Sequence, residues 1–114
     1  MIQKRIDDAT FRRPFAQFVK KARLELQLAI KNEVMAICRD PGIGEPKTGD
    51  LAGIWVHKFR YQRQQYLIAY GPAATEGKSV AVEFLMIEFY QVGSRENFYD
   101  ELKSYLKTAR PSCQ

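Results

Sequence analysis

Residues 43–59 read IGEPKTGDLAGIWVHKF, and this stretch decides how the rest of the chain is interpreted. Its first half is rich in Gly and Pro, which favour turns and end helices. Its second half opens a run from Ala52 to Arg60 that is rich in β-branched and aromatic residues, which predicts a strand. The stretch therefore marks the change from one kind of secondary structure to another.

The segment before this stretch is predicted to be helical. Thr10 is the expected N-cap, and Pro14 suits the first helical turn, where its missing N–H costs nothing. The basic run Lys20–Arg23 contains neither Gly nor Pro, so one long helix and a helix hairpin both fit. We favour a hairpin that breaks near this run, and Asp40-Pro41-Gly42 ends the segment. Apolar residues recur at three- and four-residue steps on one helix face: Phe11, Phe15, Phe18, Ala22, Leu26, Ile30, Val34 and Ile37.

Two further strands and a helix are expected after the first strand. The strands are residues 66–70, which Gly71-Pro72 end, and residues 79–92. Gly93-Ser94 opens the last helix, with Ser94 as its N-cap, and Pro111 stops it. Consecutive antiparallel strands form a meander whose buried face needs a helix layer. The predicted fold class is therefore α+β: an N-terminal helix pair packed on a small antiparallel sheet, with a C-terminal helix.

Length and composition indicate one domain over residues 1–114, with 46% hydrophobic residues and a net charge of +5. Cys38 and Cys113 lie far apart, and His57 is the only histidine, so neither a metal site nor a disulfide framework is expected. We predict no cofactor. The N-terminus does not resemble a signal peptide, and no run approaches the ~18 apolar residues of a membrane span. These features predict a cytoplasmic protein with no membrane partner.

Positive charge concentrates on the first predicted strand, because no acidic residue occurs between Asp50 and Glu76. Side chains alternate along a strand, so Lys58 and Arg60 should share the face of Val56. Cations neutralise phosphates and aromatic rings stack on unpaired bases, so this pattern suits RNA. Solvent-facing Lys and Arg residues that protect a sheet edge fit the pattern equally well.

Three segments of the chain resemble the RelE/ParE superfamily of toxins from bacterial type II toxin–antitoxin pairs. The first is the opening stretch, where a Gly-Asp-Leu-x-Gly turn at residues 49–53 leads into the first strand of the meander. The second is the aromatic and apolar strand 66–70, which ends in Tyr. Residues 92–103, VGSRENFYDELK, are similar to the Gly-x-His-Glu-Asn-Phe-Tyr-x-x-Leu-Lys ending of many members. The ordered matches cover roughly residues 38–106.

The resemblance implies a toxin held inactive by a cognate antitoxin. The RelE branch cuts mRNA, usually in the ribosomal A site, without a metal. The ParE branch instead inhibits DNA gyrase by binding. We expect a metal-free mRNA endoribonuclease (an mRNA interferase) acting on the ribosome, with any DNA contact made only through the antitoxin. A gyrase inhibitor without nuclease activity is the alternative.

The resemblance also implies a set of site residues. The expected catalytic residues are Lys58 and Arg60, which would bind and stabilise the scissile phosphate, and Arg95, which stands where many relatives have His. Expected RNA contacts are Lys47, Arg63, Tyr66 and Tyr99.

Two positions depart from the nuclease pattern. Leu67 replaces an arginine of the second strand, so that only Arg63 at the preceding turn could substitute for it. Strand alternation places His57 opposite Lys58, where a structural histidine is favoured over a general base.

Overall fold

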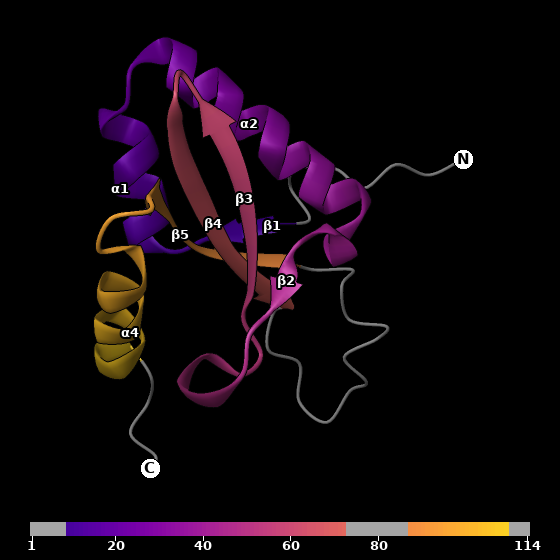
Figure 1. Cartoon of the computed structure of the whole chain (residues 1–114), viewed down its shortest axis with the longest axis vertical. Coiled ribbons are helices and arrows are strands. Elements are labelled where there is room, and N and C mark those ends of the chain that lie inside the picture. The colour runs from indigo at the N-terminus through magenta and orange to yellow at the C-terminus, as the bar shows by residue number, and fades with distance from the viewer. Residues whose placement is uncertain (1–8, 73–86, 110–114) are drawn as a thin grey trace.

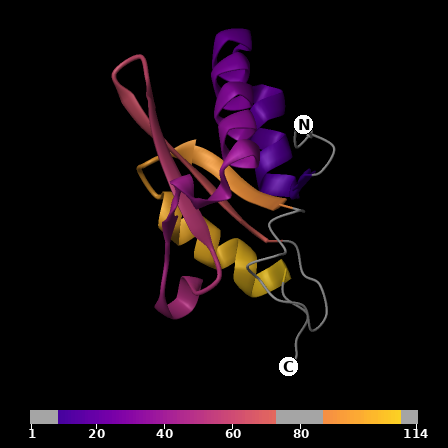
Figure 2. The same cartoon turned by 90° about the vertical axis from the view of Figure 1, so that its right-hand side faces the viewer.

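A computed structural model describes residues 9–72 and 87–109, in which a sheet separates two helical layers. Helices α1 (Arg13–Lys21) and α2 (Leu24–Arg39) cover one face, and α4 (Phe98–Ala109) covers part of the other (Figures 1 and 2). This architecture confirms the predicted α+β class, with a helix pair on the sheet and a C-terminal helix.

The sheet has the strand order β1-β5-β4-β3-β2. Antiparallel pairs join β2 to β3, β3 to β4 and β4 to β5, as a meander requires, whereas β1 runs parallel to β5. The sheet is therefore mixed rather than purely antiparallel. Its strands are β1 (Ala9–Phe11), β2 (Glu45–Pro46), β3 (Trp55–Tyr61), β4 (Gln64–Pro72) and β5 (Ile87–Ser94).

The helix pair breaks at Ala22–Arg23, which confirms the predicted hairpin. Both residues have extended backbone angles, and the amide Nε2 of Gln27 donates to the carbonyl oxygens of Val19 (2.7 Å) and Ala22 (3.2 Å). This side chain satisfies carbonyls that the end of a helix leaves without an intrahelical donor. Pro14 lies in the first turn of α1, as expected.

Alternating side chains of the strands build two hydrophobic cores. On β4, Ile68 and Tyr70 face the helix pair, whereas Leu67 and Ala69 face α4. The first core also holds Phe15, Ile30 and other apolar residues of the helix pair, together with Phe89 of β5. The second core contains three apolar residues of α4, each four positions after the last: Phe98, Leu102 and Leu106.

Several predicted boundaries are wrong. Thr10 does not cap α1, because it lies in β1 and Arg12 occupies the N-cap position. Ser94 does not cap α4 either: it pairs with Tyr66 as the last residue of β5. The helix begins at Phe98, after Asn97 reverses the chain with a φ of 64°. Sheet pairing thus overrides local capping preference at both positions.

Two predicted strands are also adjusted by the structure. The first begins at Trp55 rather than Ala52, because residues 49–51 form a 3-10 turn and Gly53 has a φ of 92°. The expected long strand 79–92 is observed from Ile87 onward as β5, and its earlier part lies outside the described residues.

Candidate functional site

β3 divides its cationic and aromatic side chains between the two sheet faces. Lys58 and Arg60 share the face of Val56, as strand alternation predicts. Val56 is buried beneath α4, but Lys58 and Arg60 are exposed, so α4 leaves this end of the sheet face open. Two steps along a strand span about 6.8 Å, so the Cα atoms of Lys58 and Arg60 lie close together.

Gln65 of β4 connects this pair to Arg95. It lies opposite Arg60 in the β3–β4 ladder, and its side-chain oxygen is 3.4 Å from the Nη1 of Arg95. The backbone N–H of Arg95 also donates to the Gln65 carbonyl oxygen at 3.1 Å. We name Lys58, Arg60 and Arg95 the cationic cluster. Within residues 9–72 and 87–109, none of the three forms an ion pair with a carboxylate, so their positive charges are not neutralised there.

Lys47 and Tyr99 approach each other on the α4 side of the sheet. The Nζ of Lys47 lies 5.5 Å from the centre of the Tyr99 ring and 3.4 Å from a carboxylate oxygen of Glu45. Burial alone would lower the pKa of Lys47, but Tyr99 and Glu45 together outweigh it and raise the pKa. Lys47 therefore remains a cation, partly balanced by Glu45, and half-buried Tyr99 offers an aromatic surface next to it.

Arg63 lies in the hairpin loop that follows Arg60, whereas Tyr66 lies on the opposite sheet face from the cationic cluster. Arg63 is exposed at the tip of the β3–β4 hairpin, where its φ is 68°. Tyr66 faces the helix pair: its ring stacks on Phe59 with centroids 5.6 Å apart and meets the edge of Phe18 at 6.4 Å. The structure thus brings Lys58, Arg60 and Arg95 together and places Tyr66 on the opposite face of the sheet.

His57 also lies on the helix-pair face. Its Nε2 is 2.7 Å from a carboxylate oxygen of Glu33 on α2, and its ring stacks against Phe59. Because His57 is the only histidine of the chain, no imidazole lies on the sheet face that carries Lys58.

Two features on the α4 side of the sheet were not predicted from the sequence. One is Gln65, which only the strand register places between two arginines. The other is a groove lined by Asp50 together with Lys103 and Lys107. The four-residue spacing of the two lysines on a predicted helix was the signal that could have indicated the second.

No group of three or more His, Cys, Asp or Glu side chains suited to a metal ion occurs within residues 9–72 and 87–109. None of the helices in the same part of the chain is both long and apolar enough to cross a membrane.

A helix pair and a C-terminal helix on opposite faces of a small sheet, with an open cationic face, are the features expected of a small type II toxin. The sequence model of the family described as "ParE-like toxin of type II bacterial toxin-antitoxin system" matches residues 10–103. The match spans most of the chain, and the chain belongs to this family. A type II toxin has a cognate antitoxin as its partner. A search of curated proteins gave no match.

Proposed function

We propose that this toxin is a metal-independent endoribonuclease that cuts mRNA and is neutralised by its antitoxin. The observation that carries the proposal is the cationic cluster on the open end of the α4 face, without a carboxylate partner in the described part of the chain. Polyanion binding needs this kind of unneutralised charge. The substrate we propose is mRNA, engaged on the ribosome in the cytosol, with DNA contacted only through the antitoxin.

The reaction joins the ribose 2′-oxygen to phosphorus and breaks the bond from phosphorus to the 5′-oxygen. The products are a cyclic 2′,3′-phosphate and a 5′-hydroxyl, and the proton of the 2′-OH is balanced by one delivered to the 5′-oxygen. The phosphorane formed in between carries extra negative charge, which fixed cations stabilise. We assign this role to Arg60 and Arg95, because the planar fork of N–H donors on a guanidinium group matches the geometry of phosphate. Lys58 binds the scissile phosphate as a compact cation with three N–H donors.

A gyrase inhibitor that acts by binding alone is the second candidate. Two observations favour it: the matched family is ParE-like, and the only imidazole of the chain is engaged with Glu33 on the other sheet face. In this case the cationic cluster would serve as a docking surface for a protein or for DNA.

Inducible expression in a bacterial host, followed by mapping of mRNA 5′ ends, tests the proposal. Lys58→Ala/Arg60→Ala removes two charges from the cluster. Lys20→Ala/Lys31→Ala removes two exposed charges from the helix pair and is the matched control. We expect the wild type and the control to arrest growth and to create new mRNA ends, and the cluster variant to do neither.

Growth arrest with intact mRNA would contradict the proposed nuclease activity and favour inhibition of gyrase. A DNA supercoiling assay would then test that inhibition. If growth arrest and mRNA cleavage persist in the cluster variant, the assignment of the cationic cluster as the catalytic site is wrong. Circular dichroism of each purified variant, compared with the wild type, establishes that it is folded.

A further inference from the structure

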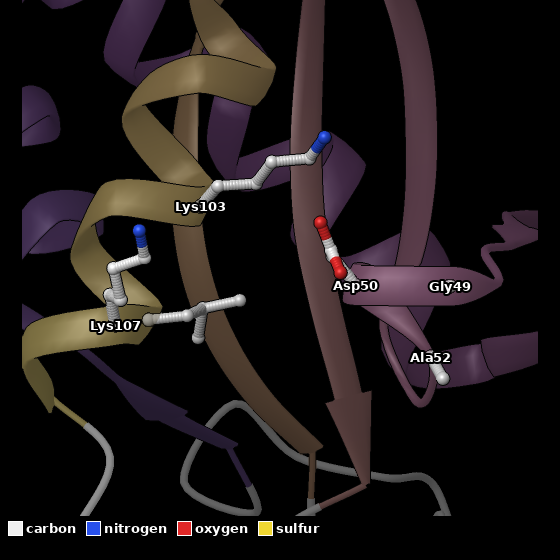
Figure 3. Close-up of a pocket in the computed structure, with 6 residues that line it drawn as sticks. Gly49, Asp50, Ala52, Lys103 and Lys107 are labelled. Atoms are coloured by element: carbon white, nitrogen blue, oxygen red, sulfur yellow. The ribbon is translucent and has the colours of Figure 1, made fainter.

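A groove separates α4 from the turn formed by residues 49–52, on the same side of the sheet as the cationic cluster. Its volume is about 530 Å³, within the range of small-ligand sites. Figure 3 shows Lys103 extending from α4 across the groove toward Asp50, with Lys107 one helical turn further along. The lining residues are Gly49, Asp50, Ala52, Lys103, Leu106 and Lys107.

Within residues 9–72 and 87–109, the charged side chains of this groove form no ion pairs. Lys103 and Lys107 are both exposed and four residues apart, a spacing at which like charges repel on a helix. Neither lysine, nor Asp50 opposite them, forms an ion pair with any residue that the structure describes. An external anion would relieve the repulsion between the two ammonium groups, and the carboxylate of Asp50 remains free to accept hydrogen bonds.

A contact between α4 and the segment before β3 lies next to the groove. Tyr99 lies one helical turn before Lys103 on α4 and contacts Lys47. The backbone N–H of Lys47 bonds to the carbonyl of Ile54, just before β3, which carries Lys58. Cations and an aromatic ring thus follow one another from α4 to β3. This pattern suits single-stranded RNA, which binds through phosphates and stacked bases.

We propose that this groove binds a nucleotide of the RNA substrate, an inference that rests on the proposed RNA-cleaving function. Lys103 and Lys107 contact backbone phosphates. Asp50 accepts hydrogen bonds from the Watson–Crick edge of the base, beside the apolar surface of Leu106. Guanine presents two adjacent N–H donors on that edge, whereas adenine and cytosine present one amino group, so guanine is the preferred base.

Fluorescence anisotropy with the full chain tests both parts of the proposal. The probes are labelled 2′-O-methyl oligouridylates that carry a single guanine, adenine or cytosine, because these cannot be cleaved by attack of the 2′-oxygen. Lys103→Gln/Lys107→Gln is compared with Lys20→Gln/Lys31→Gln, which removes the same charge from the helix pair. We expect the first variant to lose about tenfold or more in affinity, and its salt dependence to fall by about 0.7 per lost phosphate contact.

The role of Asp50 has a separate readout. In the wild type the guanine probe should bind more tightly than the other two. Asp50→Asn should remove that preference while changing the affinity for the adenine and cytosine probes little. An unchanged ranking of the three probes would overturn the assignment of the base contact.

The possible outcomes distinguish failure of the groove proposal from failure of the proposed nuclease activity. If mRNA stays intact in cells but the lysine variant loses oligonucleotide affinity, the proposed RNA cleavage fails, and the groove remains assigned to binding of single-stranded RNA. If the wild type does not bind the probes, or the lysine variant binds them equally well, the groove proposal is overturned. Loss of antitoxin co-purification in the lysine variant with unchanged RNA affinity would also overturn it, and would assign the groove to the antitoxin.

Discussion

The hydroxyl of Tyr70 fixes the loop that follows α2. It donates to the carbonyl oxygen of Pro41 and accepts from the backbone N–H of Gly44 at 2.9 Å. Burial is the main cause that raises the pKa of Tyr70 to about 12, so the hydroxyl keeps its proton at neutral pH. These bonds hold the loop against β4 just before β2, and Lys47 follows directly from β2.

Gly44→Ala should destabilise the fold by about 2 kcal/mol, because an added methyl group overpacks a filled site. Its Cβ would lie 2.4 Å from the hydroxyl oxygen of Tyr70 and 2.9 Å from a ring carbon, where no L side chain fits without displacement. Urea denaturation followed by the fluorescence of Trp55, the only tryptophan, measures the change.

Gly42→Ala is the matched control, since its Cβ would meet only Asp40 at an ordinary 3.6 Å. Equal stability losses in the two variants would contradict the role of the Tyr70 contact.

The β3–β4 hairpin closes with two residues that adopt left-handed backbone angles. Gln62 has a φ of 51° and Arg63 a φ of 68°, between the paired residues Tyr61 and Gln64. A two-residue loop with positive φ at both positions is a type I′ turn, for which Asn-Gly is preferred. Neither Gln62 nor Arg63 is a residue that favours this conformation, so the turn carries local strain.

Gln62→Asn/Arg63→Gly should therefore raise the free energy of unfolding by about 1 kcal/mol, because both new residues tolerate positive φ. Thermal denaturation by circular dichroism provides the measurement. The opposite change, Arg63→Val, should lower the stability, since a β-branched residue is disfavoured at positive φ. A double variant no more stable than the wild type would show that the turn is not strained.

Arg12 ties together segments that are far apart in the chain. Its guanidinium group pairs with Glu88 of β5, and its Nε donates to the Tyr105 hydroxyl of α4 at 3.0 Å. The guanidinium carbon also lies 5.8 Å from the ring centres of Tyr90 and Tyr105. The hydrogen bond to Glu88 is the main cause that raises the pKa of Arg12. These contacts attach α4 to the start of the helix pair.

Arg12→Ala should lower the free energy of unfolding by about 1–2 kcal/mol, from the loss of charged hydrogen bonds in a partly exposed site. Hydrogen exchange of the α4 amides should increase more than that of α2 amides, because α4 loses a direct contact. The neighbouring Arg13→Ala is the control, since Arg13 is exposed and should change stability little. An equal effect of the two substitutions would sink the idea that Arg12 anchors α4.

At the scale of the whole molecule, the sequence predicted only part of the candidate site. Alternation along β3 was sufficient to put Lys58 and Arg60 on one face and His57 on the other, and the structure confirms both placements. Tyr66 was predicted as an RNA contact, but the sheet face on which it lies depends on which residue it pairs with across the ladder. It pairs with Phe59 and therefore joins the helix-pair core. The position of Arg95 near Arg60 was not predictable either, because it depends on the contacts of Arg95 with Gln65, which pairs with Arg60.

The sequence alone determined the helix pair, its end near Asp40 and the meander, because periodicity, Gly and Pro act over a few neighbouring residues. The ordered sequence motifs also indicated the toxin family to which the chain belongs. Only the tertiary structure decided the parallel pairing of β1 with β5 and the late start of α4 at Phe98. The groove between α4 and Asp50 was also decided at this level. Each of these features depends on contacts between residues distant in the chain, whose free energy overrides local preference and which no local pattern encodes.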